Sequence, residues 1–159
     1  MKLSVGIMSF NEERIIGKTL EAIKDIADEI VVVDSHSTDS TVEIVKSFGA
    51  KVYDEDWKGN IGQANSVLEK CTGDWILILD SDEVATPDLV ESIKEAIQSD
   101  DYDGYALNRR SFYLGKLLKH AWYPDTKLRL VKRSAGAHWG GVDPHNVLYM
   151  NGKQGRLKG

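Results

Sequence analysis

The sequence has few of the features that mark secreted or membrane-spanning proteins. Among 159 residues there is one cysteine, Cys71, so no disulfide can form within the chain, which favours a reducing compartment. No apolar run approaches the ~20 residues that a membrane helix needs, and the first residues lack the apolar region of a signal peptide. We therefore expect a cytoplasmic protein, free or at the inner face of the cell membrane. Cys71 falls in a stretch of helical character and is expected to be a core thiol rather than a nucleophile.

An excess of positive charge is also missing. The chain has 20 Lys and Arg against 25 Asp and Glu, a formal net charge of -5. This balance argues against nucleic acid as a partner, because phosphate backbones are bound by clustered cations. An acidic protein that binds an anionic substrate needs local positive charge, and a divalent cation usually supplies it.

The first hundred residues alternate short apolar runs with segments of helical period. This order predicts an α/β fold with a mainly parallel sheet and helices on both faces, whose ligands bind beyond the carboxyl ends of the strands. Asn11 is a candidate cap for the first helix, an alternative to a ligand contact, and Gly49 is expected to end the second helix. The expected strands are residues 3–9, 29–33, 51–53 and 75–79, and the expected helices are residues 12–27, 41–48, 61–71 and a helix that starts at Thr86-Pro87.

After about residue 103 the pattern changes to mixed sheet and loops. Residues 104–109 and 128–132 fit strands, residues 112–120 fit either strand or helix, and residues 147–150 with Asn151-Gly152 fit half of a hairpin. We interpret residues 1–159 as one domain whose halves, 1–103 and 104–159, differ in character. The abrupt end suggests a truncated chain.

Two carboxylates follow the strongest apolar run. Residues 76–83 read Ile-Leu-Ile-Leu-Asp-Ser-Asp-Glu, and the alternation of an extended chain would place Asp80 and Asp82 on one face. Two converging hard oxygen ligands suit Mg²⁺ or Mn²⁺ shared with substrate phosphates. The alternative is a solvated acidic turn before a helix, but the position after a buried strand favours the metal site.

Polar residues also follow the first two strands. Asp34 can accept the imide N–H of a uracil, or it can cap the turn that follows, the role that suits Asp39 better. The side chains of Ser9 and Asn11 follow the first strand, where they can contact a nucleoside.

Four segments occur in the order and spacing of a known family. The chain resembles the family-two glycosyltransferases, and it is most similar to the branch with lipopolysaccharide core β-glucosyltransferases, whose members usually continue well beyond this length. The four segments are Ser9-Phe10-Asn11-Glu12, residues 28–39, Gly73-Asp74-Trp75-Ile76 and residues 79–83; Tyr123-Pro124-Asp125, Leu128-Arg129-Leu130 and residues 155–159 also fit.

The resemblance implies a GT-A fold, a UDP-sugar donor, and transfer of a hexose with inversion to a saccharide or lipid-linked acceptor of the cell envelope. It makes residues 1–103 the nucleotide-sugar-binding half and residues 104–159 the acceptor-side half. Asp34 would contact uracil, Asp80 ribose and metal, and Asp82 the metal. The expected donor contacts are Ser9, Asn11, Glu12, Asp34, Lys58, Asn65 and Asp80. Asp125 is the first choice for the base that deprotonates the acceptor, with Asp143 and His145 as competitors.

Two departures from the branch weaken the case for turnover. Asn146 follows His145 where the branch usually carries Glu, and Ala64 stands where the family often has a cation. Lys58 or Arg14 could compensate for the missing charge. A nucleotide-sugar-binding domain without turnover is therefore one alternative, and a haloacid-dehalogenase-like phosphatase, which also places Asp-x-Asp after a strand, is another.

Two surfaces are open to interpretation. The aromatic residues could form a sugar-stacking platform, although a core role is more usual. A basic face could contact a membrane, or its members could simply be solvated. The aromatic set is Tyr113, Trp122, Tyr123 and Trp139, and the basic set is Lys116, Lys119, Lys127, Arg129, Lys132 and Arg133.

Overall fold

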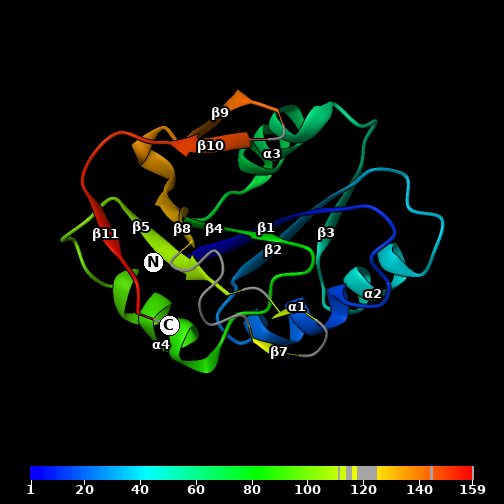
Figure 1. Ribbon diagram of the computed structural model, residues 1–159, viewed down its shortest axis with the longest axis horizontal. Helices are drawn as coiled ribbons and strands as arrows, with labels where there is room; N and C mark the ends of the chain where they lie inside the picture. Colours follow the sequence, from blue (N-terminus) through cyan, green and yellow to red (C-terminus); the bar gives the residue numbers. More distant parts are fainter. Residues whose placement is uncertain (111, 114–115, 118–124, 144, 159) are drawn as a thin grey trace.

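A computed structural model describes residues 1–110, 112–113, 116–117, 125–143 and 145–158, and it describes only the backbone of 112–113 and 116–117. Four helices and eleven strands alternate along the described parts of the chain (Figure 1). The helices are α1 Ile16–Ile23, α2 Thr41–Ser47, α3 Gly59–Lys70 and α4 Pro87–Ala96, with a short 3₁₀ helix at Arg133–Ala135. The strands are β1 Leu3–Ser9, β2 Glu29–Asp34, β3 Lys51–Asp54, β4 Trp75–Asp80, β5 Gly104–Arg109, β6 Phe112–Tyr113, β7 Lys116–Leu117, β8 Asp125–Lys132, β9 His138–Val142, β10 His145–Tyr149 and β11 Gln154–Arg156.

Seven strands form one central sheet in the order β11-β5-β8-β4-β1-β2-β3. Its neighbouring strands are parallel, except that β8 runs antiparallel to both β4 and β5. The strands β1 to β5 therefore end at the same edge of the sheet, and β8 begins there. The expected α/β architecture with a mainly parallel sheet is confirmed.

Alternating side chains of β4 enter two separate cores. Trp75, Leu77 and Leu79 pack with residues of α1 and α4, whereas Ile76 and Ile78 pack with residues of α3 and of the β9–β10 hairpin. Figure 1 shows α3 and the hairpin on one face of the sheet, with α1, α2 and α4 on the other. Because both faces are covered, the strand is an almost continuous apolar run rather than an alternating one.

Helix α3 packs closely against β1 because residue 6 is a glycine. A Cβ atom at Gly6 would overlap the side chain of Val67 and lie 3.2 Å from the Sγ atom of Cys71. Cys71 is only 3% exposed, which confirms the expected core thiol, and burial raises the pKa of this thiol to about 12.

Native Cys71 is expected to react with a disulfide reagent such as DTNB about a hundredfold or more slowly than in the unfolded chain. The reason is that only the thiolate attacks, and at about pH 8 burial suppresses both the thiolate and its access to the reagent. Stopped-flow labelling with and without denaturant measures the ratio. A native rate within tenfold of the unfolded rate would contradict the buried position.

Several expected element ends were wrong. Helix α1 starts at Ile16 rather than residue 12, and Asn11 does not cap it, because Asn11 adopts the left-handed conformation (φ 51°) and its side chain turns to the loop after β2. Strand β8 starts at Asp125, three residues earlier than expected. The strand expected at 147–150 pairs with the strand before it, β9, rather than with a strand after Asn151-Gly152.

Other expectations about local structure are confirmed. The Oγ1 atom of Thr86 accepts a hydrogen bond from the N–H of Leu89 and caps α4, and Gly49 takes a positive φ of 77° after α2. Residues 112–113 and 116–117 form a small antiparallel strand pair, while residues 118–120 lie outside the described residues. Within the described part of the chain, no helix has the length and apolarity needed to span a bilayer.

Candidate functional site

The residues that follow the strands meet at one edge of the sheet. The residue pairs Ser9–Asp34, Met8–Asp80 and Arg109–Asp125 are direct neighbours in the strand register. Asp125 belongs to this edge because β8 runs antiparallel and starts where β4 and β5 end. The carboxylates of Asp34, Asp80 and Asp125 are thus brought to one side of the molecule from positions far apart in the sequence.

The carboxylate of Asp34 lies in a small cradle of hydroxyl and N–H groups. Its Oδ1 atom accepts hydrogen bonds from the hydroxyls of Ser9 and Ser37, both at 2.6 Å, and its Oδ2 atom accepts one from the N–H of Ser37 at 2.7 Å. Asp34 is 1% exposed. The three hydrogen bonds leave acceptor capacity on Oδ2, which accepts one of them, for a further donor such as a nucleobase N–H.

Asn11 and Glu12 connect the loop after β1 to the loop after β2. The Oδ1 atom of Asn11 accepts a hydrogen bond from the N–H of Thr38 at 2.8 Å, and its own N–H donates to the hydroxyl of Ser37 at 2.8 Å. The N–H of Glu12 donates to Oγ1 of Thr41 at 2.8 Å. Ser9, Asn11, Glu12 and Asp34 are therefore brought together, as expected, with the side chain of Asn11 acting on the loop backbone.

Asp80, at the end of β4, is held by a buried arginine. The guanidinium of Arg129 meets the carboxylate with both of its terminal nitrogens, NH1 to Oδ1 at 3.3 Å and NH2 to Oδ2 at 2.9 Å. Arg129 is 5% exposed, and its guanidinium lies 5.7 Å from the ring centre of Trp139. Such a two-point contact fixes the plane of the carboxylate as well as its position.

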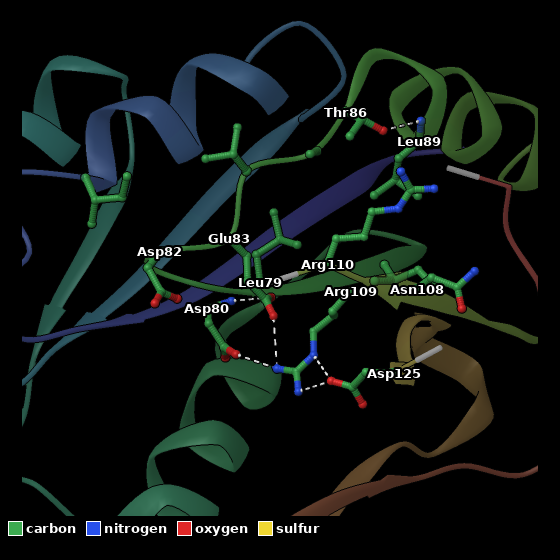
Figure 2. Close-up of a pocket in the computed structure, with 14 residues that line it drawn as sticks. Leu79, Asp80, Asp82, Glu83, Thr86, Leu89, Asn108, Arg109, Arg110 and Asp125 are labelled. Atoms are coloured by element: carbon green, nitrogen blue, oxygen red, sulfur yellow. Dashed lines mark hydrogen bonds and ion pairs between the residues drawn. The ribbon is translucent and has the colours of Figure 1, made fainter. Parts of the chain in front are cut away.

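A second arginine bridges three carboxylates. Figure 2 shows the guanidinium of Arg109 between Asp80 and Glu83 on one side and Asp125 on the other. Its NH2 and Nε atoms lie 2.6 Å and 2.9 Å from Oδ2 of Asp125, and its NH1 atom lies 3.2 Å from Glu83 and 3.5 Å from Asp80. Glu83 also accepts a hydrogen bond from the backbone N–H of Asp80 at 2.9 Å.

Burial raises the pKa values of the acid groups, whereas the two arginines lower them. Burial alone would raise the pKa of Asp80, but the charge and hydrogen bonds of Arg129 outweigh it and lower that pKa. Burial raises the pKa of Glu83, and the negative charge of Asp80 adds to the effect. Burial also opposes the charged form of Asp125, yet the hydrogen bonds and charge of Arg109 lower the pKa of this carboxyl.

Asp82 differs from Asp80 in its surroundings. It is exposed and makes no hydrogen bond or ion pair with the residues that the structure describes (Figure 2). Both lie on a cavity of about 800 Å³. The cavity is also lined by Glu83, Arg109, Arg110, Asn108, Thr86 and Asp125 and by the apolar residues Ile15, Leu79, Val84, Ala85, Leu89 and Leu107.

The described residues contain no group of three His, Cys, Asp or Glu side chains arranged to hold a metal ion. Both oxygens of Asp80 are bound by Arg129, whereas Asp82 has no such partner among the described residues and is the carboxylate beyond β4 that is open to Mg²⁺ or Mn²⁺. One carboxylate completed by substrate phosphate oxygens and water is a usual environment for Mg²⁺. Asp82 can thus hold such a cation together with a diphosphate, while Asp80 keeps its partner.

The other expected site residues lie outside this network. Lys58 pairs with Glu55 at 2.8 Å. The amide of Asn65 exchanges two hydrogen bonds with the backbone of Trp139, at 2.8 and 3.0 Å, and joins α3 to β9. Asp143 accepts a hydrogen bond from the backbone N–H of Asn60 at 3.0 Å, in the first turn of α3. His145 is exposed at the start of β10.

Some residues of the expected aromatic platform and of the expected basic face are buried. Trp139 is 8% exposed and belongs to the core beneath α3, which confirms the core role for this aromatic residue. Arg129 is not part of a solvated basic face, because it is buried against Asp80. Ala64 is also buried, at 1% exposure. The side chains of Tyr113, Lys116, Lys119, Trp122 and Tyr123, and Pro124, lie outside the described residues.

Three residues of the network were not assigned a role from the sequence: Glu83, Arg109 and Arg129. Glu83 follows Asp80 by three residues, the spacing of a turn that brings the two together. Arg109 ends a predicted strand, and Arg129 interrupts an apolar one between Leu128 and Leu130. A charge inside a buried strand requires a partner of opposite charge, and this is the signal that the sequence offered.

Known proteins are similar to this chain in sequence and in fold. An uncharacterised glycosyltransferase of Rickettsia typhi is 39% identical over 104 residues, covering 65% of this chain and 36% of its own length. The lipopolysaccharide core biosynthesis glycosyltransferase LpsC of Rhizobium meliloti is 31% identical over 169 residues, covering 99% of this chain and 61% of its own length. The chain thus spans about a third to three fifths of these relatives.

The structural likeness extends to a solved structure. Residues 1–349 of Staphylococcus aureus TarS, in complex with UDP-GlcNAc, match with a TM-score of 0.68 and 19% identity, over 88% of this chain and 49% of that one. The expected GT-A fold is thereby confirmed. The family model for glycosyl transferase family 2 matches residues 4–151 of this chain. This chain therefore belongs to glycosyl transferase family 2.

Proposed function

We propose that the chain binds a UDP-sugar across the carboxyl edge of its sheet and transfers the hexose, with inversion, to a saccharide or lipid-linked acceptor of the cell envelope. The observation that carries the proposal is the convergence of two features at this edge. The Asp34 cradle at the ends of β1 and β2 provides hydrogen-bonding groups for a nucleoside. The exposed carboxylate of Asp82, just beyond β4, provides a cation ligand for the diphosphate.

The similar proteins support this choice of substrates. TarS, which shares the fold, has been crystallised with UDP-GlcNAc, and LpsC is named for lipopolysaccharide core biosynthesis. An acceptor that belongs to the cell envelope favours a position in the cytoplasm at the inner face of the membrane. In this proposal residues 1–103 supply the donor half and residues 104–159 the acceptor side.

The chemistry requires a leaving group to be stabilised and an acceptor hydroxyl to be deprotonated. A divalent cation bound by Asp82 would balance the charge that grows on the departing diphosphate, an effect worth several kcal/mol. Asp125 would take the proton of the acceptor hydroxyl as the new glycosidic bond forms and the bond to the diphosphate breaks. Such a base contributes ~10²–10⁴ in rate.

We propose Asp125 for this role rather than Asp143 or His145 because of its surroundings. Asp125 lines the same cavity as Asp80 and Asp82, and Arg109 joins it to Asp80. Asp143, in contrast, lies against the first turn of α3. The lowered pKa of Asp125 keeps it ionised at neutral pH, at the expense of some basicity.

A calorimetric screen of UDP, UDP-glucose, UDP-GlcNAc and GDP-mannose, with and without Mn²⁺, tests the proposal. UDP and at least one UDP-sugar are expected to bind, with Mn²⁺ strengthening the affinity at least about tenfold through the diphosphate. Equal binding of GDP-mannose would contradict the assignment of uracil to the Asp34 cradle. Failure of every uridine nucleotide to bind would sink the proposal as a whole.

The alternative of a binding domain without turnover rests on Ala64 and Asn146. Slow, Mn²⁺-dependent hydrolysis of a bound UDP-sugar separates the two possibilities, because water can replace the acceptor in an assembled active site but not in a binding remnant. No observation favours a phosphatase: Asp80 lies on the fourth strand along the chain, its carboxylate is held by Arg129, and the family is that of glycosyltransferases.

A further inference from the structure

Arg109 occupies a position that the backbone itself fixes. It is the last residue of β5, and Asp125, the first residue of β8, lies opposite it in the antiparallel register. Directly opposed residues of an antiparallel pair have Cβ atoms about 5 Å apart, within reach of side-chain contact. The two strand ends thus present Arg109 and Asp125 to one another before any substrate is present.

The contacts of Arg109 divide between the two sides of the cavity. Nε and NH2 both donate to one oxygen of Asp125, at 2.9 and 2.6 Å, while NH1 donates to Glu83 at 3.2 Å. A planar guanidinium places these donors in a fixed fork, so binding one carboxylate restricts the position of the other. The side chain of Arg109 is about one third exposed, which leaves it open to the cavity but partly shielded from bulk water.

The charged groups around Asp125 show that its orientation depends mainly on Arg109. From β5 it faces Arg109, from its own strand it faces Lys127 at 3.6 Å, and across the guanidinium it faces the carboxylates of Glu83 and Asp80. The side chain of Lys127 is half exposed and reaches only the other oxygen, Oδ1. Without Arg109, the long contact with Lys127 would be the described ion pair left to orient Asp125, and no described side-chain contact would join Asp125 to Glu83 and Asp80.

We propose that Arg109 is a positioning residue. It holds Asp125 in the orientation needed to receive the proton of the acceptor, and it links Asp125 to the carboxylates of Glu83 and Asp80. This inference rests on the proposed function, in which Asp125 is the base. Arg109 contacts no reacting atom in this scheme and acts through Asp125. Both donors of Arg109 lie on Oδ2, so the acceptor hydroxyl would approach Oδ1, where Lys127 lies 3.6 Å away.

The test compares Arg109→Met and Arg109→Lys with Lys127→Met in Mn²⁺-dependent hydrolysis of UDP-glucose. Methionine preserves much of the aliphatic stem but has no donors. R109M is expected to lower kcat about a hundredfold, the lower end of a general base contribution, while KM changes less than threefold. R109K should recover only a small part of the lost kcat, because an ammonium group cannot donate to both carboxylates with the fixed geometry of a guanidinium. K127M removes a positive charge beside Asp125 but no bridge to Glu83, and it should lower kcat clearly less than R109M does.

The pH profile adds a readout that loss of fold would not produce. The base is active when ionised, and Arg109 lowers the pKa of Asp125, so the acid limb of kcat/KM should move to higher pH in R109M. A smaller shift is expected in K127M. Thermal melting confirms that each variant is folded.

Three outcomes would overturn the inference: an unchanged kcat and acid limb in R109M, a KM raised tenfold with kcat retained, or full recovery in R109K. Wild-type protein that binds UDP-glucose but does not hydrolyse it would instead contradict the proposed turnover. In that case, NMR titration of the Asp125 carboxyl carbon in wild type and R109M still tests whether Arg109 acts on Asp125. An Asp125 titration that does not move on substitution would overturn its role, independently of activity.

Discussion

Asp82→Ala is expected to weaken Mn²⁺-dependent binding of UDP-sugars by about a hundredfold or more and to remove detectable turnover. A cation shared between one carboxylate and a diphosphate contributes several kcal/mol, and each 1.4 kcal/mol is about a factor of ten in affinity. Since both oxygens of Asp80 are bound by Arg129, this neighbouring carboxylate is not free to replace Asp82. Titration calorimetry with UDP and Mn²⁺ measures the loss.

The same variant should keep the stability of the wild type. Asp82 is exposed and has no hydrogen-bond or ion-pair partner among the described residues, so its removal should cost less than about 0.5 kcal/mol. Asp88→Asn is the matched control: Asp88 is an exposed carboxylate in the first turn of α4 that does not line the cavity. It should bind UDP and Mn²⁺ as the wild type does. Wild-type affinity in Asp82→Ala would refute the cation site.

The sequence was sufficient for the first four strands and for the edge of the sheet where the site lies. The apolar run of β4, bounded by Gly73 and Asp80, is typical of a buried strand, and the alternation of such runs with helical segments indicated a mainly parallel sheet. Polar residues at the ends of those strands then had to meet. The position of Asp34 beside Ser9 followed from this topology, and the two residues are partners in the register of β1 and β2.

What the sequence could not provide were contacts that depend on long-range pairing. Arg129 and Asp80 are 49 residues apart, and Arg109 and Asp80 are 29 apart. No periodicity links such pairs, because they meet only once β8 inserts antiparallel between β4 and β5. Asn11 was misjudged for a related reason: the same side chain can cap its own helix or a neighbouring loop, and here the loop after β2 competes successfully.

Arg129→Met is expected to destabilise the protein by about 3 kcal/mol. Removing one partner of a buried ion pair typically costs about 3–5 kcal/mol, since the other charge is left without compensation. The lower end applies because the side chain of Asp80 is 36% exposed and Arg109 remains near it. Urea unfolding measures the change, and the melting temperature should fall by roughly 6–12 °C for a domain of this size.

The control variants separate the loss of a charge pair from the loss of an arginine. Arg133→Met makes the same replacement at an exposed residue, whose Nε donates only to the carbonyl of Gly73, and should cost less than about 1 kcal/mol. Adding Asp80→Asn to Arg129→Met removes the uncompensated carboxylate and should restore part of the lost stability. Only part can return, because Glu83 also loses its contact with Arg129, 3.4 Å away. If Arg129→Met cost less than 1 kcal/mol, or if the double variant were less stable than the single one, then Arg129 would not be the partner that allows Asp80 to remain charged at the edge of the sheet.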